Sequence, residues 1–570
     1  MSNLLEQASL VMIPSGYKED VVYSEIPLDG SGDMAFTRAS NGTRINSQGL
    51  VEVCPWNLLQ YSEDFTNAFW NKATSGSATL SVTANQTTAP NGTNTADLIS
   101  ITRSAVSELS AVYTFVGQGI GTFKNSIWLK AKDSSNVGKT IDLWSWEGAT
   151  RGYTKITLTA DWVRYEQNTT VFTGSASELF DFGLLPSGFS TSTTLAVEFY
   201  VWGAQANIGS TAKPYFPTTD RLNVPRLTYQ NGGGGCPSLL LEKQSTNLLL
   251  YSNQLDLWTR FTNTTKSIDN SVIDPEGNFA NKYLRNSSSV AIASLDGVSI
   301  SASTTYTFTY FAKKGNYSQI NVEVGSGANN VQLSYNFDTG ALTGVSYGSQ
   351  TLISSSASSF GNGWVRITGV FTGSITSINY TIYIGSAINT YVYLYGAQLE
   401  ASSYPTSYIP TTSSSATRVE DACSKTGISS LIGQTSGTLF VQWINLNNEL
   451  CNLIETYNSA SGITGTSSIL IQKSANNQLN IRVFDSLGNY GDAFSVTMPI
   501  GTNKVALAYE PGAAIMYLNG VAIGSNSRTY VFGSTRDSIA FDNRGSYARS
   551  EVVLFPTRLT NAELASLTTI

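Results

Sequence analysis

Short segments in which apolar and polar side chains alternate run through most of this chain. In "NSIWLKAK" (125–132), Ile127, Leu129 and Ala131 fall on one face, and in "TYTFTYFAKK" (305–314) aromatic residues alternate with threonines. A period of two is typical of a half-buried strand, because successive side chains of a strand point to opposite faces. Such segments recur at a spacing of roughly 8–12 residues, with Gly, Ser and Asn turns between them. The pattern predicts an all-β protein built from jelly-roll sandwiches.

Two long stretches of the chain repeat one another. The phrase "NLLQYSEDFTNAFW" (57–70) returns as "NLLLYSNQLDLW" (247–258). Later landmarks return in the same order, namely "DWVRYEQNTTVFTGS" as "GWVRITGVFTGS" and "VWGAQ" as "LYGAQ". Fixed landmarks with insertions between them indicate one scaffold with variable loops. The sequence therefore predicts two jelly-roll modules, at 54–220 and 245–412.

The remaining segments differ from the repeats. Residues 413–570 are expected to form a third sandwich, in which Asn519 and Gly520 supply the positive φ angles of a type I′ hairpin turn. Residues 1–53 are shorter than a domain and are expected to be a docking arm. Residues 221–244 contain four consecutive glycines and are expected to connect the two modules as a hinge.

Composition narrows the possible functions. Only 13% of the 570 residues are charged, the net charge is −7 and no run of Lys and Arg occurs, so we expect no nucleic-acid partner. Histidine is absent, which excludes Ser-His-Asp and Cys-His hydrolysis and the HExxH zinc site. Neither a signal peptide nor an apolar run of 18 residues is found, so membrane insertion is not expected. The four cysteines form no CxxC pair and are expected to be reduced thiols in buried pockets.

The phrase "LWSWEGATRGY" in the first module concentrates candidate binding groups. Trp144 and Trp146 are two residues apart, so both would point to the same face of a strand, and Glu147, Arg151 and Tyr153 follow closely. Sugar-binding sandwiches lay aromatic rings against the C–H groups of a pyranose and fix its hydroxyls with a few polar groups. These five residues are therefore a candidate carbohydrate platform. The alternative is that the shared face is the sandwich interior. The second repeat has no "WSW", which favours a specialised role in the first.

Other tryptophans are expected in the core. Trp70 and Trp258 close the two opening phrases, and Trp162 and Trp364 begin "WVR" in each repeat. Matched positions in two diverged repeats indicate a shared packing role. Trp443, on the first strand of the third unit, is expected in the core as well.

Several phrases resemble bacteriophage virion proteins. They are "YGAQLE…YPTSYIPTT…ATRVED" at the end of the second module, "GGGCPSLLLE" in the connector and the leader "FTRASNGTRINSQGLVEV" (36–53). In these phrases the chain is similar to tail fibres, head fibres and related adhesins built from carbohydrate-binding-module-like jelly rolls, especially in phages of Bacteroides and their crAss-like relatives. "MYLNGVAIG" and "LTNAELASL" resemble a laminin-G/concanavalin-type sandwich at the C-terminus.

The resemblance implies a location and partners. It implies a non-enzymatic protein of the virion, made in the host cytoplasm, whose N-terminal arm docks onto other head or tail proteins. Its modules would attach the particle to host cell-surface polysaccharide, and it would be a homo-oligomer, more often a trimer than a dimer. Two alternatives stay open, a purely structural decoration or adaptor without sugar binding and a glycan-degrading depolymerase. No spacing singles out a carboxylate pair for glycoside hydrolysis, so no catalytic residue is expected.

Two further expectations depend on the resemblance. Related modules often hold structural calcium near the start of the jelly roll, which makes Glu63 and Asp64 candidate ligands. The second copy reads "YSNQL" and lacks both carboxylates. In related single-module proteins the leader runs directly into "VPR…Y…GGCPSLLLE", so residues 36–53 and 221–242 are expected to pack together around the inserted first module.

Overall fold

The chain folds into two compact units. The structure, a computed structural model, describes every residue except 1, 116–120, 148–149, 169, 173–177, 231–232, 374, 448, 464, 475, 477, 495, 497 and 542–545. One unit is Cys54–Arg221, and the other joins Met1–Val53 to Leu222–Ile570. In the described part, no helix is long and apolar enough to cross a membrane.

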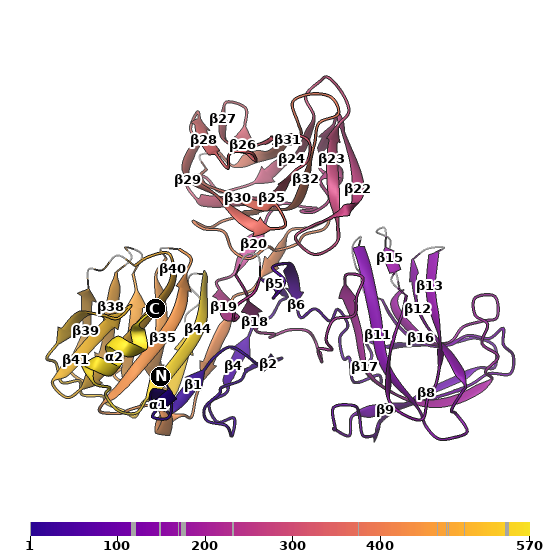
Figure 1. Ribbon diagram of the computed structural model, residues 1–570, viewed down its shortest axis with the longest axis horizontal. Helices are drawn as coiled ribbons and strands as arrows, with labels where there is room; N and C mark the ends of the chain where they lie inside the picture. Colours follow the sequence, from indigo (N-terminus) through magenta and orange to yellow (C-terminus); the bar gives the residue numbers. More distant parts are fainter. Residues whose placement is uncertain are drawn as a thin grey trace. The chain divides into compact units, whose positions relative to one another are not determined.

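The unit Cys54–Arg221 is a sandwich of two antiparallel sheets. Within the described residues, one sheet has the order β13-β12-β16-β10-β7 and the other β14-β11-β17-β9-β8, with β15 also paired to β11 (Figure 1). The first sheet comprises β7 (Asn71–Thr74), β10 (Ser110–Phe115), β12 (Thr140–Glu147), β13 (Thr150–Thr157) and β16 (Glu178–Leu184). The second comprises β8 (Thr79–Thr87), β9 (Ala96–Thr102), β11 (Gly121–Ala131), β14 (Val163–Glu166), β15 (Thr170–Phe172) and β17 (Ala196–Ile208).

Alternate side chains of both sheets fill the core of this unit. Ile127, Leu129 and Ala131, which the sequence pattern places on one face, are all buried in it. Trp70 lies in the same core, and its indole N–H donates to the backbone oxygen of Tyr61 at 3.0 Å. The predicted strand and the predicted core position of Trp70 are confirmed.

The second repeat forms another two-sheet sandwich. Within the described residues its sheets have the orders β21-β24-β31-β26-β27-β28 and β22-β23-β32-β25-β30-β29. The first comprises β21 (Arg260–Thr262), β24 (Ile292–Ser299), β26 (Gln319–Ser326), β27 (Asn329–Asn336), β28 (Leu342–Tyr347) and β31 (Ser377–Tyr383). The second comprises β22 (Thr264–Ile273), β23 (Phe279–Arg285), β25 (Thr305–Lys314), β29 (Thr351–Gly361), β30 (Trp364–Thr372) and β32 (Tyr391–Glu400). Trp258 is buried in the core between them, as predicted.

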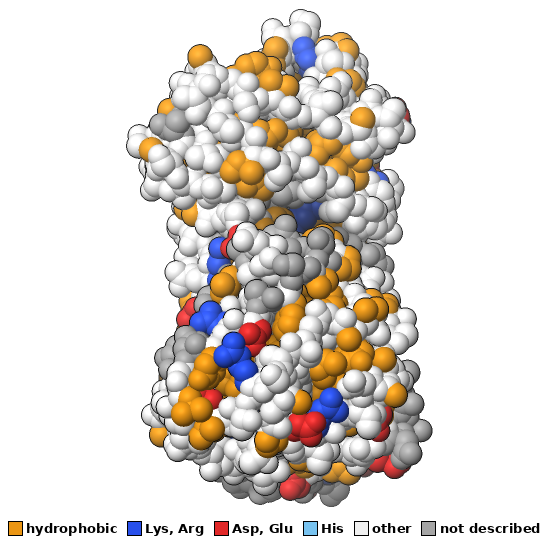
Figure 2. Space-filling model, turned by 90° about the vertical axis from the view of Figure 1, so that its left-hand side faces the viewer, with side chains coloured by type: hydrophobic (Ala, Val, Ile, Leu, Met, Phe, Trp, Pro, Cys, Tyr) orange, Lys and Arg blue, Asp and Glu red, His pale blue; other side chains and the backbone are white. Residues whose placement is uncertain are grey.

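A third sandwich contains the C-terminal residues. Its sheets have the orders β18-β19-β44-β35-β40-β41-β42, with β1 on β44, and β2-β3-β4-β34-β43-β36-β37-β38-β39 among the described residues. The first comprises β1 (Leu10–Met12), β18 (Arg226–Thr228), β19 (Ser238–Glu242), β35 (Gly437–Asn445), β40 (Gly501–Glu510), β41 (Ala513–Leu518), β42 (Val521–Asn526) and β44 (Ser546–Phe555). The second comprises β2 (Tyr17–Lys18), β3 (Val21–Val22), β4 (Met34–Thr37), β34 (Ala422–Lys425), β36 (Cys451–Tyr457), β37 (Ser468–Lys473), β38 (Leu479–Asp485), β39 (Gly488–Phe494) and β43 (Ser538–Phe541). The face shown in Figure 2 carries few charged side chains.

Small elements complete the architecture. They are the two-stranded pairs β5 (Gly42–Ile45) with β6 (Val51–Cys54) and β20 (Ser245–Asn247) with β33 (Ala416–Arg418), the helices α1 (Ser2–Leu5) and α2 (Asn561–Thr568), and the 3₁₀ turns Leu255–Leu257 and Ser429–Leu431. Asn519 and Gly520 join β41 to β42 with φ angles of +49° and +86°, as the predicted hairpin requires. Trp443 is buried in the core of the third sandwich. The predicted all-β class, with tandem sandwiches and a C-terminal sandwich, is confirmed.

Strands β1 to β4 of residues 1–53 complete the two sheets of the third sandwich, and the expected role of this segment as a docking arm stays a prediction. β1 pairs with β44, where Leu10 lies opposite Leu554, and β4 pairs with β34. Leu10, Met34 and Phe36 are fully buried in the C-terminal core. The physical reason is that these alternating apolar residues gain more by completing two sheets than a detached arm could gain in water.

The leader and the connector pack together, as predicted for residues 36–53 and 221–242. The backbone N–H of Tyr229 donates to the carbonyl oxygen of Ile45 at 2.9 Å, and that of Asn223 donates to the carbonyl oxygen of Arg38 at 3.0 Å. The two segments therefore remain neighbours although the first module separates them in the sequence.

Buried ion pairs stabilise the junction between the leader (36–53) and the connector (221–242). Arg226 binds Glu242 at 2.8 Å and Asp421 at 2.5 Å, and Arg38 binds Asp421 at 3.0 Å. Burial alone would raise the pKa of Glu242, but the Arg418 and Arg226 guanidiniums outweigh it and lower that pKa. The network thus joins the leader, the connector and the segment that follows the second module.

The two "WVR" tryptophans lie outside the main inter-sheet cores. Trp162 is only half-buried and packs in a separate aromatic cluster, donating its indole N–H to the carbonyl oxygen of Thr88 at 3.0 Å. Trp364 is buried, in a comparable separate cluster, and donates to the carbonyl oxygen of Ile273 at 2.8 Å. The core position expected for Trp364 is therefore confirmed, since its ring is buried in a hydrophobic cluster, and the one expected for Trp162 is corrected, because that ring is only half-buried.

All four cysteines are free thiols. Cys54, Cys423 and Cys451 are buried, as expected, but Cys236 is exposed. Burial raises the pKa of Cys423 to about 12, so this thiol stays protonated at neutral pH.

Candidate functional site

The strand that carries the candidate tryptophans has two apolar faces. On β12, Ile141 and Leu143 point into the inter-sheet core, and Trp144 belongs to a different cluster with Ala111 and Leu185. Because side chains alternate along a strand, Trp144 and Trp146 share the face that points away from the core. The alternative that these rings fill the sandwich interior is therefore wrong.

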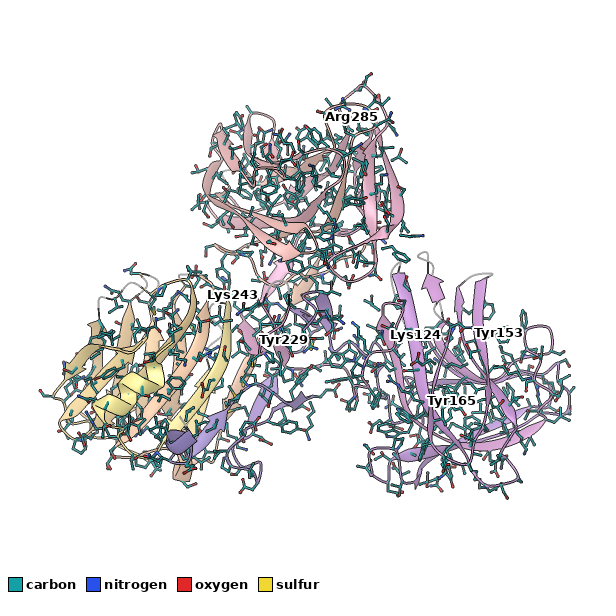
Figure 3. All side chains as sticks on the ribbon, in the orientation of Figure 1. Lys124, Tyr153, Tyr165, Tyr229, Lys243 and Arg285 are labelled. Carbon is teal, nitrogen blue, oxygen red and sulfur yellow. The ribbon has the colours of Figure 1, made fainter. Side chains whose placement is uncertain are left out.

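A row of aligned side chains crosses all five strands of this outer face, and we call it the aromatic row because three of its five members are aromatic. The strand register aligns Asn71, Tyr113, Asp181, Trp144 and Tyr153 from β7 through β10, β16 and β12 to β13. Tyr153, which Figure 3 labels on β13, is 40% exposed, and Trp144 is 3% exposed. The row thus combines the accessible ring of Tyr153 at one end with the buried indole of Trp144 next to it.

A cavity of about 270 Å³ opens beside this row. Tyr113, Trp144 and Trp146 supply its aromatic walls, and Ala73 and Ala111 line it from two neighbouring strands. Ala73 lies opposite Ala111, and Ala111 lies opposite Gly183, so small residues occupy adjacent positions on three strands. The hollow exists because these positions carry little or no side chain.

A loop after β16 closes one side of the cavity with Leu185, Pro186 and Phe189. The buried carboxylate of Asp142 holds this loop, accepting from Ser190 Oγ at 2.7 Å and from the backbone N–H of residue 185 at 3.3 Å. Burial raises the pKa of Asp142, and these hydrogen bonds only partly offset the shift. The loop is therefore fixed to the sheet by a group that itself does not line the cavity.

The structure brings together only part of the predicted carbohydrate platform. Trp144 and Trp146 line the cavity, and Tyr153 lies beside Trp144 in the register. Glu147 and Arg151 belong to β12 and β13, but their side chains lie outside the described residues.

Sequence reasoning missed four residues that line the cavity, namely Tyr113, Ala73, Ala111 and Phe189. Tyr113 belongs to the alternating phrase "AVYTF", where its period-two spacing from Phe115 could have suggested a second aromatic strand. Ala73 and Ala111 could not be recognised as lining residues from the sequence, because a small side chain forms part of a cavity only when its neighbours on the adjacent strands are known. Phe189 comes from a loop that no local pattern places over the sheet.

The corresponding face of the second module is polar. There the register aligns Arg260, Ser294, Thr381, Glu323 and Gln332 across β21, β24, β31, β26 and β27. Ser294 and Thr381 share a hydrogen bond of 2.8 Å. The aromatic face is therefore a feature of the first module and not of the shared scaffold.

The two candidate calcium ligands are held by different protein groups. Glu63 Oε1 accepts from the Tyr215 hydroxyl at 3.1 Å, and burial raises the pKa of Glu63. Asp64 Oδ1 accepts from the backbone N–H of Thr66 at 3.0 Å. No group of three or more acidic or cysteine side chains that could hold a metal ion occurs among the residues the structure describes. The calcium expectation thus finds no assembled site there.

A larger cavity, about 400 Å³, lies in the other unit and is lined in part by Arg44, Glu242 and Arg366. Arg44 is paired with Glu52 at 2.8 Å, and Glu242 is paired with Arg226. Arg44 also donates to the carbonyl oxygen of Leu227 at 3.1 Å, so these side chains belong to the packing of the leader and the connector. We therefore take the aromatic cavity of the first module as the candidate site.

Comparisons with known proteins do not identify the ligand. No family model and no curated protein matches the chain. Among solved structures, the chain is similar to the CBM40 of Ruminococcus gnavus IT-sialidase, at 12% identity over 24% of this chain and 84% of that chain with a TM-score of 0.22. It is also similar to the CBM22-1–CBM22-2 tandem domain of Paenibacillus barcinonensis Xyn10C, at 13% identity over 61% and 98% of the two chains with a TM-score of 0.21. Likenesses at this level do not bear on what this chain binds.

Proposed function

We propose that the outer aromatic face of the first module binds glycans, and that the protein is a non-enzymatic virion component that attaches a phage to host surface polysaccharide. The observation that carries the proposal is the aromatic row beside an open cavity on the face of β12 that points away from the core. Rings placed this way can stack on the C–H face of a sugar, and neighbouring polar groups can bind its hydroxyls. The virion assignment is supported by the phrases that resemble phage fibres and adhesins.

The site favours binding over hydrolysis. Two buried carboxylates, Asp142 and Asp181, belong to the same sheet face, but neither lines the cavity. Asp142 is engaged by Ser190 and the loop backbone. A glycosidase needs two carboxyl groups flanking the scissile bond, and the absence of any carboxylate among the described lining residues supports the proposal of a binding site.

One small cavity gives weak affinity, which multiple copies can raise. A second contact by another copy on the same particle is intramolecular, so avidity exceeds the affinity of a single site. We therefore propose a homo-oligomer, with a trimer favoured over a dimer, whose partners are other virion proteins and host polysaccharide. The mass of the purified protein from light scattering tests the copy number.

A glycan array probed with the full chain tests the binding proposal. We expect binding that Trp146→Ala and Tyr153→Ala each weaken at least about tenfold, since aromatic anchors dominate small binding sites. Tyr347→Ala is the matched control, because Tyr347 is 44% exposed in the second module and Tyr153 is 40% exposed in the first. Absence of binding to any glycan, or equal loss in the control, would contradict the proposal.

Labelling tests the location separately. An antibody against the protein should decorate intact particles in electron micrographs, and host cells should retain the purified protein. Decoration without retention would favour the purely structural alternative. Cleavage of host polysaccharide by the purified protein would favour the depolymerase alternative.

A further inference from the structure

We infer that the cavity of the first module takes the methyl group of a 6-deoxyhexose, such as fucose or rhamnose. The inference rests on the proposed function and narrows it to one class of sugar. Three properties support it: the residues that line the cavity, the backbone geometry that forms it and the free-energy cost of burying a sugar hydroxyl there.

The lining is apolar. Among the lining residues that the structure describes, no side chain is charged, and the polar side-chain groups are the Tyr113 hydroxyl and the indole N–H groups of Trp144 and Trp146. The remaining lining residues are alanine, leucine, proline and phenylalanine. A sugar group that enters must therefore be one that needs few hydrogen bonds.

The hollow is built into the sheet. Gly183 neighbours Ala111 in the register and has a φ of +142°, a conformation that side-chain-bearing residues rarely adopt. An added Cβ there would contact the backbone of Ser110. Arg103, which is 4% exposed, donates to the carbonyl oxygen of Leu185 at 2.9 Å and so holds the covering loop from a second side. The small residues of three neighbouring strands thus leave the hollow open, and hydrogen bonds hold the covering loop to the sheet.

Its volume has room for the methyl-bearing edge of one sugar. At about 270 Å³ it lies just below the range of about 300–1,000 Å³ that is usual for small-molecule pockets. The exposed end of the aromatic row, at Tyr153, can then carry the next sugar of a chain.

Hydroxyl burial decides which sugar is preferred. Most hexoses carry a CH₂OH group at C5, and 6-deoxyhexoses carry a methyl group there. A hydroxyl placed among alanine, leucine and phenylalanine loses its hydrogen bonds to water, whereas a methyl group gains from the same burial. A hydrophobic pocket discriminates such pairs by about 10- to 100-fold.

The second module shows the contrasting arrangement. Its corresponding face joins Glu323 to the Tyr383 hydroxyl at 3.0 Å and places Ser294 beside Thr381. Polar groups that bind one another in this way offer a sugar methyl group few apolar contacts. We therefore expect the 6-deoxyhexose preference to reside in the first module alone.

Matched sugar pairs test the inference with the full chain. Methyl α-L-fucoside differs from methyl α-L-galactoside, and methyl α-L-rhamnoside from methyl α-L-mannoside, only by methyl in place of CH₂OH. Titrations followed by saturation-transfer NMR should show the 6-deoxy member of at least one pair binding about 10-fold or more tightly. Equal binding within both pairs, or a preference found only for N-acetylhexosamines, would overturn the inference and leave glycan binding intact. Failure to bind any glycan would remove the proposed function itself.

A loop variant places the effect in the cavity. Phe189→Ala should reduce the preference, within whichever pair shows it, to less than about threefold, because the methyl group loses one wall. Phe279→Ala is the control, since Phe279 is 46% exposed in the second module and Phe189 is 48% exposed in the first. An unchanged preference in Phe189→Ala, or an equal loss in Phe279→Ala, would overturn the assignment to this cavity.

Discussion

Removing one arginine from the buried junction should destabilise the larger unit strongly. The Arg226 side chain is fully buried, with Glu242 at 2.8 Å and Asp421 at 2.5 Å from its guanidinium nitrogens. Arg226→Met keeps most of the side-chain volume but deprives both buried carboxylates of a charged donor. Breaking a buried pair costs about 3–5 kcal/mol. Because Arg418 stays 3.5 Å from Glu242 and Arg38 stays 3.0 Å from Asp421, we expect the free energy of unfolding to fall by about 3 kcal/mol.

Urea unfolding measures this loss against an exposed pair of the same kind. Arg260→Met removes the ion pair with Asp296, in which the arginine is 44% exposed, and should cost no more than about 1 kcal/mol. The transition of the larger unit should move to lower urea for Arg226→Met, while that of Cys54–Arg221 should stay in place because it contains no member of the network. Equal shifts for the two variants would refute the reasoning, as would an equal shift in the transition of Cys54–Arg221.

Three further predictions concern the first module. Burial raises the pKa of Asp97 to about 6, above its usual unfolded value of about 3.9. Between these two values the folded state binds the extra proton, so this unit should gain stability as the pH falls from about 6 to 4. Urea unfolding at several pH values should show a flatter pH dependence for Asp97→Asn, and an unchanged slope would contradict the prediction. Gly183→Ala should cost about 1–3 kcal/mol in the same assay, because the added Cβ meets the Ser110 backbone, and a neutral result would show that the strand adapts. Asp142→Ala removes two hydrogen bonds that hold the loop carrying Phe189, so it should weaken glycan binding. The far-ultraviolet circular dichroism should stay that of a β-sandwich. Unchanged glycan affinity would show that the site does not need these hydrogen bonds.

Much of the fold was predictable because period-two alternation is a local property. The segment 125–132 forms part of β11 and buries the three residues expected, and the repeated phrases mark two sandwiches of the same kind. The sheets that the strands of residues 1–53 join were not predictable. β1 pairs with β44 more than 500 residues away, and no local pattern encodes which sheet edge an apolar strand will join.

The candidate site was predictable only in part for a related reason. The two-residue spacing of Trp144 and Trp146 fixes that they share a face, but β12 carries large apolar side chains on both faces, so the sequence cannot say which face is the core. The cavity depends on Ala73 and Ala111 from other strands and on a loop held by Asp142. Those contributions arise from register and tertiary hydrogen bonds, which a single sequence does not display.

Hydroxyl-radical footprinting of the full chain, with and without a bound glycan, tests the central claim most directly. Peptide-resolved mass spectrometry should show protection of Trp146, Tyr153 and Phe189 on glycan binding, with Tyr347 in the second module unchanged. Protection confined to the second module or to the C-terminal sandwich, with these three rings still fully oxidised, would contradict a glycan site on the aromatic face of the first module.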